Sequence, residues 1–299
     1  MLAPTTTAAP SPTTTALALP PLPAIPAGDV RALLTSTGVV VPVEGAAAGG
    51  FSVETPCGNR AIANGQPLAA AMVVLDAGHG GNESGAIGPN GLTEKDLNLN
   101  VVRNAKGALE AVGVPVALTR TGDYRVTLGV RAEIVTKLRP LAFVSVHHNS
   151  SPDGPRPQGP GTETYFQVQS PESKRLAGLV YEEVVRALSQ YTGVAWVADT
   201  DAGAKYRLNS RGGDYYGILR MTAGVPSALA ELAFVTNPPE ADLLARPEVQ
   251  AVEGRAVARG IVRYLTTKDP GSGFVTPYDR TEPAGPGGGS SGCTDPPLG

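Results

Sequence analysis

The sequence has little of what marks several large classes of protein. Its 299 residues include only two cysteines and three histidines, and no Cys-x-x-Cys pair of the zinc-ribbon kind occurs. No apolar run reaches the roughly 18 residues that a membrane-spanning helix needs, so we expect no span. The formal net charge is −3 and the pI is about 5.7. This balance argues against a nucleic-acid partner, and we expect a partner that is small, neutral or held by specific contacts.

The two cysteines, Cys57 and Cys293, lie far apart and outside the expected core. They are either unpaired thiols or a disulfide that ties a C-terminal tail to an N-terminal arm, which requires an oxidising compartment. The sequence leaves both alternatives open. The first 28 residues contain no Lys or Arg, so the basic start of a secretory signal is missing. We expect the signal to have been removed or to be incomplete in this chain.

Both ends of the chain have a biased composition. Residues 1–50 begin with a low-complexity stretch of Ala, Thr and Pro and predict a disordered or extended arm. Residues 268–299 are rich in Gly, Pro and Ser and predict a loose tail. Between them we expect one folded domain over residues 51–267, with its core at residues 72–265.

Within this core, short apolar runs alternate with segments whose apolar residues recur at helical spacing. The expected strands cover residues 72–76, 114–119, 141–147, 162–168, 216–219 and 227–231. The expected helices cover residues 97–112, 128–138, 173–188 and 249–265. This order predicts a single α/β domain whose mainly parallel, twisted sheet of about six strands has helices on both faces.

Chemically active side chains follow the ends of these strands. In a parallel sheet, ligands bind beyond the carboxyl ends of the strands, where Asp76, His147 and Glu231 would lie together. All three histidines of the chain, His79, His147 and His148, occur at two of these ends. Histidine is the commonest protein ligand of metal ions, so the distribution indicates one site that needs imidazole.

Two of the candidates have simpler interpretations. His79 lies among glycines that allow a sharp turn and expose the imidazole, but it is also compatible with a buried structural histidine or a phosphate-binding turn. No Lys follows as in a P-loop, which argues against phosphate. Glu94 follows Thr93, a good N-cap, and so begins a helix. Taken alone, Glu94 needs no role beyond a favourable interaction with the helix dipole.

Three further candidates depend on the geometry of their strands. His147 and His148 point to opposite faces of an extended strand, so we expect only one of them to bind an ion. Glu231 closes an apolar run, and burial of an unpaired charge is costly. It either reaches solvent just past the strand or serves as an acid or base at the carboxyl edge of the sheet.

Taken together, four segments resemble the zinc-dependent N-acetylmuramoyl-L-alanine amidases of the Amidase_3 family. The resemblance covers about residues 73–265, and the four motifs occur in the order of the family. They are DAGHGG at 76–81, TEKDLNL at 93–99, SVHHN at 145–149 and PSALAELAFVTNP at 226–238. Lesser matches are LTR at 118–120, Asp123 and Arg131.

The resemblance implies a ligand set and a reaction. His79, Glu94 and His147 would bind one Zn²⁺ per chain, and Glu231 would be the catalytic carboxylate. The substrate would be peptidoglycan or a muropeptide, cut at the amide between N-acetylmuramic acid and L-alanine. Such an enzyme is expected to be a monomer that is secreted, periplasmic or in the cell wall. Ala77, Glu83, Thr136 and Ala233 depart from common family residues, but none of them replaces a ligand.

Four more residues are candidates for supporting or substrate-binding roles. Asp76, His148 and Asn149 would orient ligands or strand ends, although Asp76 is equally compatible with a turn. Arg211 would meet a substrate carboxylate or lie exposed in a loop.

Some relatives carry a helix after the second histidine motif that plugs the zinc site. Residues 150–160 are too few and too rich in proline for one, so we expect an open cleft. Three alternatives stay open for the whole chain: a zinc peptidase acting within wall peptides, a non-catalytic wall-binding protein of the same fold, and an α/β domain with incidental histidines.

Overall fold

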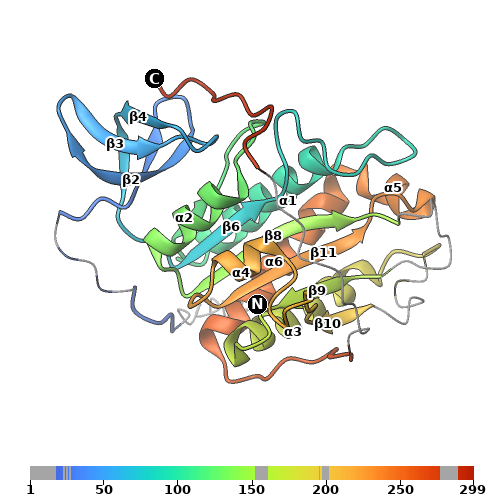
Figure 1. The fold of residues 1–299 in the computed structure, drawn as a ribbon. Helices are drawn as coiled ribbons and strands as arrows, with labels where there is room; N and C mark the ends of the chain where they lie inside the picture. Colours follow the sequence, from blue (N-terminus) through green and yellow to red (C-terminus); the bar gives the residue numbers. More distant parts are fainter. Residues whose placement is uncertain are drawn as a thin grey trace, which may run out of the picture.

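A computed structural model describes residues 18–22, 24, 26, 28–151, 161–194, 196, 202–276 and 289–299. These residues form two β-sheets and six helices (Figure 1). The strands are β1 (Ala32–Thr35), β2 (Val40–Ala47), β3 (Gly50–Glu54), β4 (Arg60–Ala63), β5 (Gly65–Leu68), β6 (Val73–Ala77), β7 (Val116–Leu118), β8 (Ala142–Asn149), β9 (Glu163–Phe166), β10 (Gly203–Lys205) and β11 (Ser227–Phe234). The helices are α1 (Glu94–Glu110), α2 (Leu128–Leu138), α3 (Pro171–Leu188), α4 (Gly217–Met221), α5 (Pro238–Leu244) and α6 (Pro247–Thr266).

The larger sheet has six strands in the order β10-β9-β11-β8-β6-β7. Every pair of neighbouring strands in this sheet is parallel except β9 and β11, which are antiparallel. The predicted α/β fold is confirmed, but this sheet is mixed. No helix separates β8 from β9 among the described residues, and a return to parallel pairing normally needs a long crossover, usually a helix.

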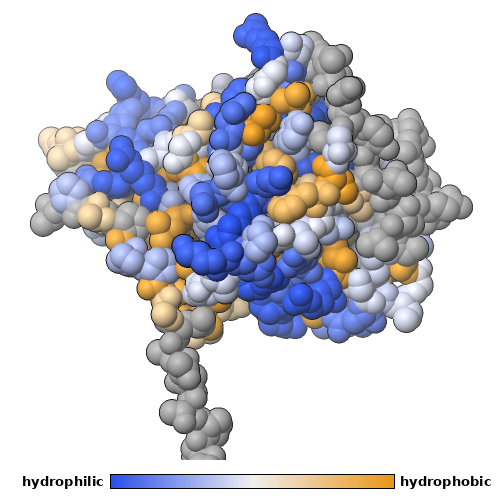
Figure 2. Space-filling model, turned by 90° about the horizontal axis from the view of Figure 1, so that it is seen from below, coloured by the Kyte–Doolittle hydropathy of each residue, from blue (hydrophilic) through white to orange (hydrophobic). Residues whose placement is uncertain are grey.

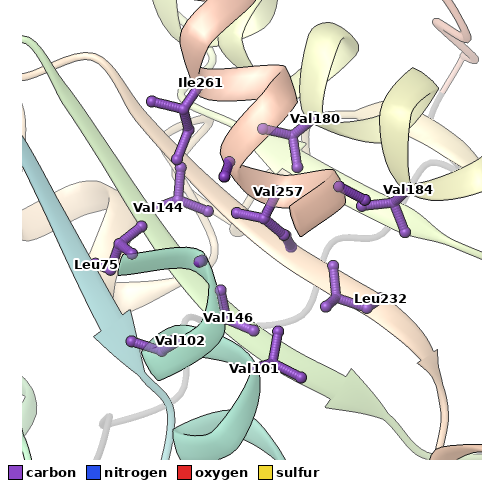
Figure 3. Packing of buried hydrophobic residues seen from close by; sticks show 14 of the residues in the cluster. Leu75, Val101, Val102, Val144, Val146, Val180, Val184, Leu232, Val257 and Ile261 are labelled. Carbon is purple, nitrogen blue, oxygen red and sulfur yellow. The ribbon is translucent and has the colours of Figure 1, made fainter. Parts of the chain in front are cut away.

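Helices cover both faces of the larger sheet, as predicted. Along β6, Val73 and Leu75 pack into one hydrophobic cluster and Val74 into another, because successive side chains of a strand point to opposite faces. The first cluster includes α1, α3 and α6, and the second includes α2 and α4. Figure 3 shows the first cluster, in which valines of the three helices face Val144 and Leu232 of the sheet.

A second, antiparallel sheet of five strands was not predicted. Its order is β4-β3-β2-β1-β5, and it lies beside α2 at one end of the larger sheet (Figure 1). The expected arm over residues 1–50 is therefore wrong for residues 32–47, which form β1 and β2. Periodicity cannot assign runs this short, and here pairing decides: Leu33 lies opposite both Val41 and Pro67.

The C-terminal residues 289–299 are attached to the smaller sheet, so the expected loose tail is wrong for this part. Cys57 and Cys293 form a disulfide across a sequence separation of 236 residues. The Asp295 carboxylate accepts hydrogen bonds from Thr55 Oγ1, the Cys57 amide and Asn59 Nδ2, each at 2.8 Å. In Figure 1 the red C-terminal segment runs along this end of the molecule.

Two smaller expectations also change. The strand expected over residues 216–219 is wrong, because residues 217–221 form the short helix α4, and β10 was not expected. Most of residues 150–160, for which we expected no plugging helix, lies outside the described residues, as do residues 1–17 of the arm and 277–288 of the tail.

The surface offers no strong single signal on the face that Figure 2 shows. Hydrophilic residues occupy much of its centre, and hydrophobic residues form separate patches. Scattered surface hydrophobic residues are normal for a folded chain. Within the described parts of the chain, none of the helices combines the length and the apolar character that crossing a bilayer requires.

Candidate metal centre

Three candidate ligands, His79, Glu94 and His147, meet at the carboxyl edge of the larger sheet. His79 follows β6, Glu94 begins α1, and His147 lies in β8. One ligand atom from each lies within 4.8 Å of the others. His79 Nε2 is 3.2 Å from Glu94 Oε2, and His147 Nδ1 is 2.9 Å from Glu94 Oε1. The fold thus gathers three residues that are far apart in the sequence, and their role as ligands stays a prediction.

The backbone at His79 is held in an unusual conformation. Its φ of 62° lies in the left-handed region, which residues other than glycine rarely adopt. Arg131 donates a hydrogen bond of 2.6 Å to the His79 carbonyl, and Arg120 donates to the carbonyls of Ala77 at 2.8 Å and Gly78 at 2.9 Å. Such strain persists only where the surroundings hold it, and here two buried arginines do so.

Two glycines allow the ligands to approach closely. A Cβ atom on Gly78 would lie 2.1 Å from His147 Cε1, which is impossible without displacing the imidazole. A Cβ atom on Gly85 would lie 2.5 Å from Glu94 Oε2 and 2.6 Å from His79 Cδ2. The glycines near the first histidine therefore make room for the other two ligands as well as forming a turn.

Glu94 is the negative group of this cluster. Burial alone would raise its pKa, but hydrogen bonds from His147 and His79 hold the pKa of the carboxyl well below its usual range. The Ala86 amide also donates to Oε2 at 2.9 Å. An ionised carboxylate with two imidazoles is a ligand set of catalytic zinc sites, so these residues fit that metal. The simpler interpretation also holds, since Glu94 lies at the N-terminus of α1.

Glu231 lies in β11 with its residue partners His147 on β8 and Glu163 on β9. Burial, followed by the negative charges of Glu94 and Glu163, raises the pKa of its carboxyl well above the usual range. Its Oε2 atom is buried and has no hydrogen-bond partner among the described residues. The strand continues past Glu231 to Phe234, so the carboxylate does not simply reach solvent at a strand end.

Sequence reasoning missed Glu163, the neighbour of Glu231. Its carboxylate accepts a hydrogen bond of 2.6 Å from Tyr165 and one of 3.1 Å from Asn149, and Lys205 Nζ lies 3.3 Å away. Asn149 therefore supports this second carboxylate. The available signal was an acidic residue inside the otherwise uncharged expected strand at 162–168, but strand order was needed to place it beside Glu231.

Asp76 lies inside β6, so the alternative of a turn is wrong for it. Its buried carboxylate pairs with Arg131 at 2.5 Å and accepts hydrogen bonds from Ser145, at 2.5 Å, and Thr119. Burial alone would raise the pKa of Asp76, but Arg131 and the two hydroxyls lower it to about 2. Asp76 thus anchors the same arginine that holds the carbonyl of His79.

The two remaining candidates lie in different surroundings. His148 is buried, with its ring between Asn98 and Glu253. Arg211 is exposed, and its backbone amide donates a hydrogen bond to Asn209 Oδ1 within a turn. This agrees with the simpler alternative of a loop arginine. A cavity of about 200 Å³ borders the cluster and is lined by His79, His147, Arg131, Val126, Leu128 and Tyr216, among others.

Comparisons with known proteins point to one family. The family model described as N-acetylmuramoyl-L-alanine amidase, Amidase_3, matches residues 73–263. The Uncharacterized protein YqiI of Bacillus subtilis is 35% identical over 211 residues, which cover 70% of this chain and 90% of that protein. The N-acetylmuramoyl-L-alanine amidase AmiC of Neisseria meningitidis is 31% identical over 224 residues, covering 66% of this chain and 53% of its own length. The matched part thus spans about half of that amidase.

A solved structure agrees with this match. N-acetylmuramoyl-L-alanine amidase AmiC2 of Nostoc punctiforme has a TM-score of 0.54 and 34% sequence identity, covering 65% of this chain and 97% of that one. The range matched by the family model includes the His79, Glu94 and His147 cluster and Glu231. The five-stranded sheet at residues 32–68 lies outside it.

Proposed function

Because this chain belongs to the Amidase_3 family of N-acetylmuramoyl-L-alanine amidases, we propose that it is a zinc-dependent peptidoglycan hydrolase. The bond cut would be the amide between N-acetylmuramic acid and the L-alanine of the stem peptide. The observation that carries the proposal is the cluster of His79, Glu94 and His147 with Glu231 on the adjoining strand.

In this proposal the three clustered side chains hold one zinc ion. Two imidazoles and a carboxylate would suit a catalytic zinc site, which uses three protein ligands of this kind. When bound, zinc in such a set polarises a carbonyl and lowers the pKa of a bound water to about 7. Arg120, Arg131 and Asp76 hold the backbone that carries His79, so this ligand is positioned by hydrogen bonds at the strand end.

Glu231 is the proposed proton carrier. Its carboxylate accepts a proton from the water that attacks the lactyl carbonyl carbon, and returns it to the amide nitrogen as the C–N bond breaks. The products are a free lactyl carboxyl and a peptide with a free L-alanine amine. The raised pKa of Glu231 agrees with a group that both takes up and releases a proton.

The reaction outcome separates this proposal from its alternatives. Muropeptides of defined structure are incubated with the protein, and mass spectrometry identifies the products. An amidase releases intact stem peptide and a sugar with a free lactyl carboxyl, whereas a wall peptidase shortens the peptide and leaves it on the sugar. A wall-binding protein of this fold would release neither. Chelation should abolish release and one equivalent of zinc should restore it; release that survives full removal of metal contradicts the zinc dependence.

We also propose that the chain acts outside the cytoplasm, in the cell wall or periplasm, as a monomer. Support comes from the Cys57–Cys293 disulfide, which is typical of oxidising compartments, and from relatives such as a probable cell wall amidase of Staphylococcus saprophyticus. The division into arm, catalytic domain at 51–267 and tail stays a prediction, except where the strands at 32–47 and the attached residues 289–299 correct it.

A further inference from the structure

A network of buried polar side chains reaches Glu94 at Oε1, the carboxylate oxygen that also lies 2.9 Å from His147 Nδ1. His148 Nδ1 is 2.8 Å from Asn98 Oδ1, and its Nε2 is 3.3 Å from Glu253 Oε1 on α6. Asn98 in turn donates to Glu94 Oε1 at 3.3 Å. The backbone amide of His148 also donates to Glu94 Oε1, at 3.2 Å. This network of polar side chains therefore links α6, β8 and α1 to one carboxylate.

The hydrogen-bond partners show which atoms of this network donate and which accept. The Asn98 side-chain amide donates to Gly78 O at 3.2 Å and to the Glu94 carboxylate, so its oxygen must face His148. Because that oxygen only accepts, the proton of this contact lies on His148 Nδ1. The Nε2 atom is then left for Glu253. In this orientation both polar atoms of the Asn98 side chain have partners, the nitrogen at Gly78 and Glu94 and the oxygen at His148.

Burial of this polar network in an apolar core costs free energy. Asn98 and Glu253 are 0% exposed and His148 is 1% exposed, beside the apolar cluster of α1, α3 and α6. One oxygen of Glu253 has no partner among the described residues, which carries a desolvation penalty. Replacing all members of such a buried polar group together with apolar residues of similar size is often neutral or stabilising. A contribution to stability alone therefore accounts poorly for a histidine and a glutamate here.

We propose that Glu253, His148 and Asn98 form a positioning unit that orients the Glu94 carboxylate for the metal. The inference rests on the proposed metal site and extends it to residues that do not touch the ion. Outer partners of metal ligands typically change affinity by roughly 10- to 100-fold when they are removed. His148, which is not expected to bind zinc itself, would then set how tightly its neighbour His147 and Glu94 do so.

The test compares metal binding with stability in the full chain. His148→Leu and Glu253→Leu break the unit at two points, and Glu253→Gln keeps a side chain of the same length that can donate to or accept from His148 Nε2. Gln250→Leu removes hydrogen bonds to Leu244 and Asn100 one turn away on α6. Zinc affinity is measured by competition with a chromogenic chelator. The visible spectrum of the Co²⁺-substituted protein reports ligand geometry, and thermal unfolding of the metal-free protein reports stability.

We expect both leucine variants at this unit to bind zinc roughly 10- to 100-fold more weakly, with an altered Co²⁺ spectrum. Because each replacement leaves a buried polar partner unpaired, their metal-free forms should also unfold at a lower temperature. Gln250→Leu shows whether lost stability alone weakens zinc binding. Glu253→Gln should bind zinc nearly as the original protein does, and Gln250→Leu should change stability without changing affinity.

Two results would overturn the inference in different ways. If the unaltered protein binds zinc and releases peptide, but Glu253→Leu matches its affinity and Co²⁺ spectrum, the positioning role is wrong and the proposed function stands. If the unaltered protein binds no zinc, the proposed function fails and this inference fails with it. Should His148→Leu not fold, the pair Glu253→Leu and Glu253→Gln still decides the matter.

Discussion

The two sheets of this molecule are built in opposite ways and carry different things. The larger sheet is mainly parallel, and its carboxyl edge gathers His79, His147 and Glu231. The smaller sheet is antiparallel, so its strand ends alternate between two edges. It is attached to the C-terminus by the disulfide at Cys57 and by the hydrogen bonds of Asp295.

The comparison separates chemistry from attachment. Parallel strands place many loops at one edge, where functional side chains meet, whereas an antiparallel sheet of short strands has little core and benefits from a covalent link. The smaller sheet has a core cluster of only a few buried residues around Leu33, Val41 and Val53. We therefore expect changes at the two sheets to have separable effects on turnover and on stability.

The largest expected effect is on turnover, from changes at the larger sheet. Glu231→Ala should retain zinc but lose peptide release by roughly 10²- to 10⁴-fold, because the proposed proton carrier is gone. His79→Ala should lose both zinc and release. Metal analysis and the muropeptide assay measure the two properties separately.

The control for these variants lies on the smaller sheet. Arg60→Ala alters an exposed side chain of β4 and should leave zinc content and turnover unchanged. Near-native release by Glu231→Ala would show that another group carries the proton, and the contrast between the sheets would lose its chemical basis.

The next effect is on stability, from the attachment of the smaller sheet. Replacing both cysteines, Cys57→Ser with Cys293→Ser, should lower the free energy of unfolding by about 2–4 kcal/mol, since the bond closes a very long loop. Urea unfolding followed with and without reductant measures this loss. Zinc affinity at low temperature should stay as it was.

Reductant provides the matched control, because it should destabilise the original protein and leave the double serine variant unaffected. If the double variant lost zinc in proportion to its lost stability, the two sheets would form one cooperative unit and the proposed separation would be wrong.

A smaller effect should depend on pH and arise in the larger sheet. The pKa of Asp76 is about 2 in the folded chain against an ordinary value of 3.8. A lowered folded pKa contributes stability that is present above about pH 4 and is lost as the pH falls toward 2. At 1.36 kcal/mol per pKa unit, the contribution is about 2 kcal/mol.

Comparing the protein with Asp76→Asn isolates this carboxylate from others that titrate in the same range. The gap in unfolding free energy between the two should be about 2 kcal/mol larger at pH 6 than at pH 2. A gap that does not change with pH would mean that the Asp76–Arg131 pair makes no net electrostatic contribution to stability.

Much of the larger sheet was predictable because its signals are local. The apolar run before Asp76 and the helical spacing after Glu94 each lie within a few residues, and both elements are present. The family motifs predicted that His79, Glu94, His147 and Glu231 lie at one edge of the sheet. The fold brings them together there. The direction of β9 could not be predicted from local signals. Because β9 is antiparallel to β11, the sheet is mixed.

The smaller sheet was missed because its signals are not local. Its strands are four to eight residues long, and Leu33 becomes a strand residue only through its partners Val41 and Pro67. Composition likewise made residues 289–299 appear loose, although Asp295 and Cys293 attach them to residues more than 200 positions earlier.

The sequence by itself therefore determined which residues match the family motifs and which strand ends present them, because motif spacing and periodicity are properties of neighbouring residues. Only the tertiary structure decided which side chains contact those residues. Glu163 lies beside Glu231, and His148, which contacts Glu253, reaches Glu94 through Asn98. These contacts join separate elements, and their free energy depends on burial and distance, which no single stretch of sequence encodes.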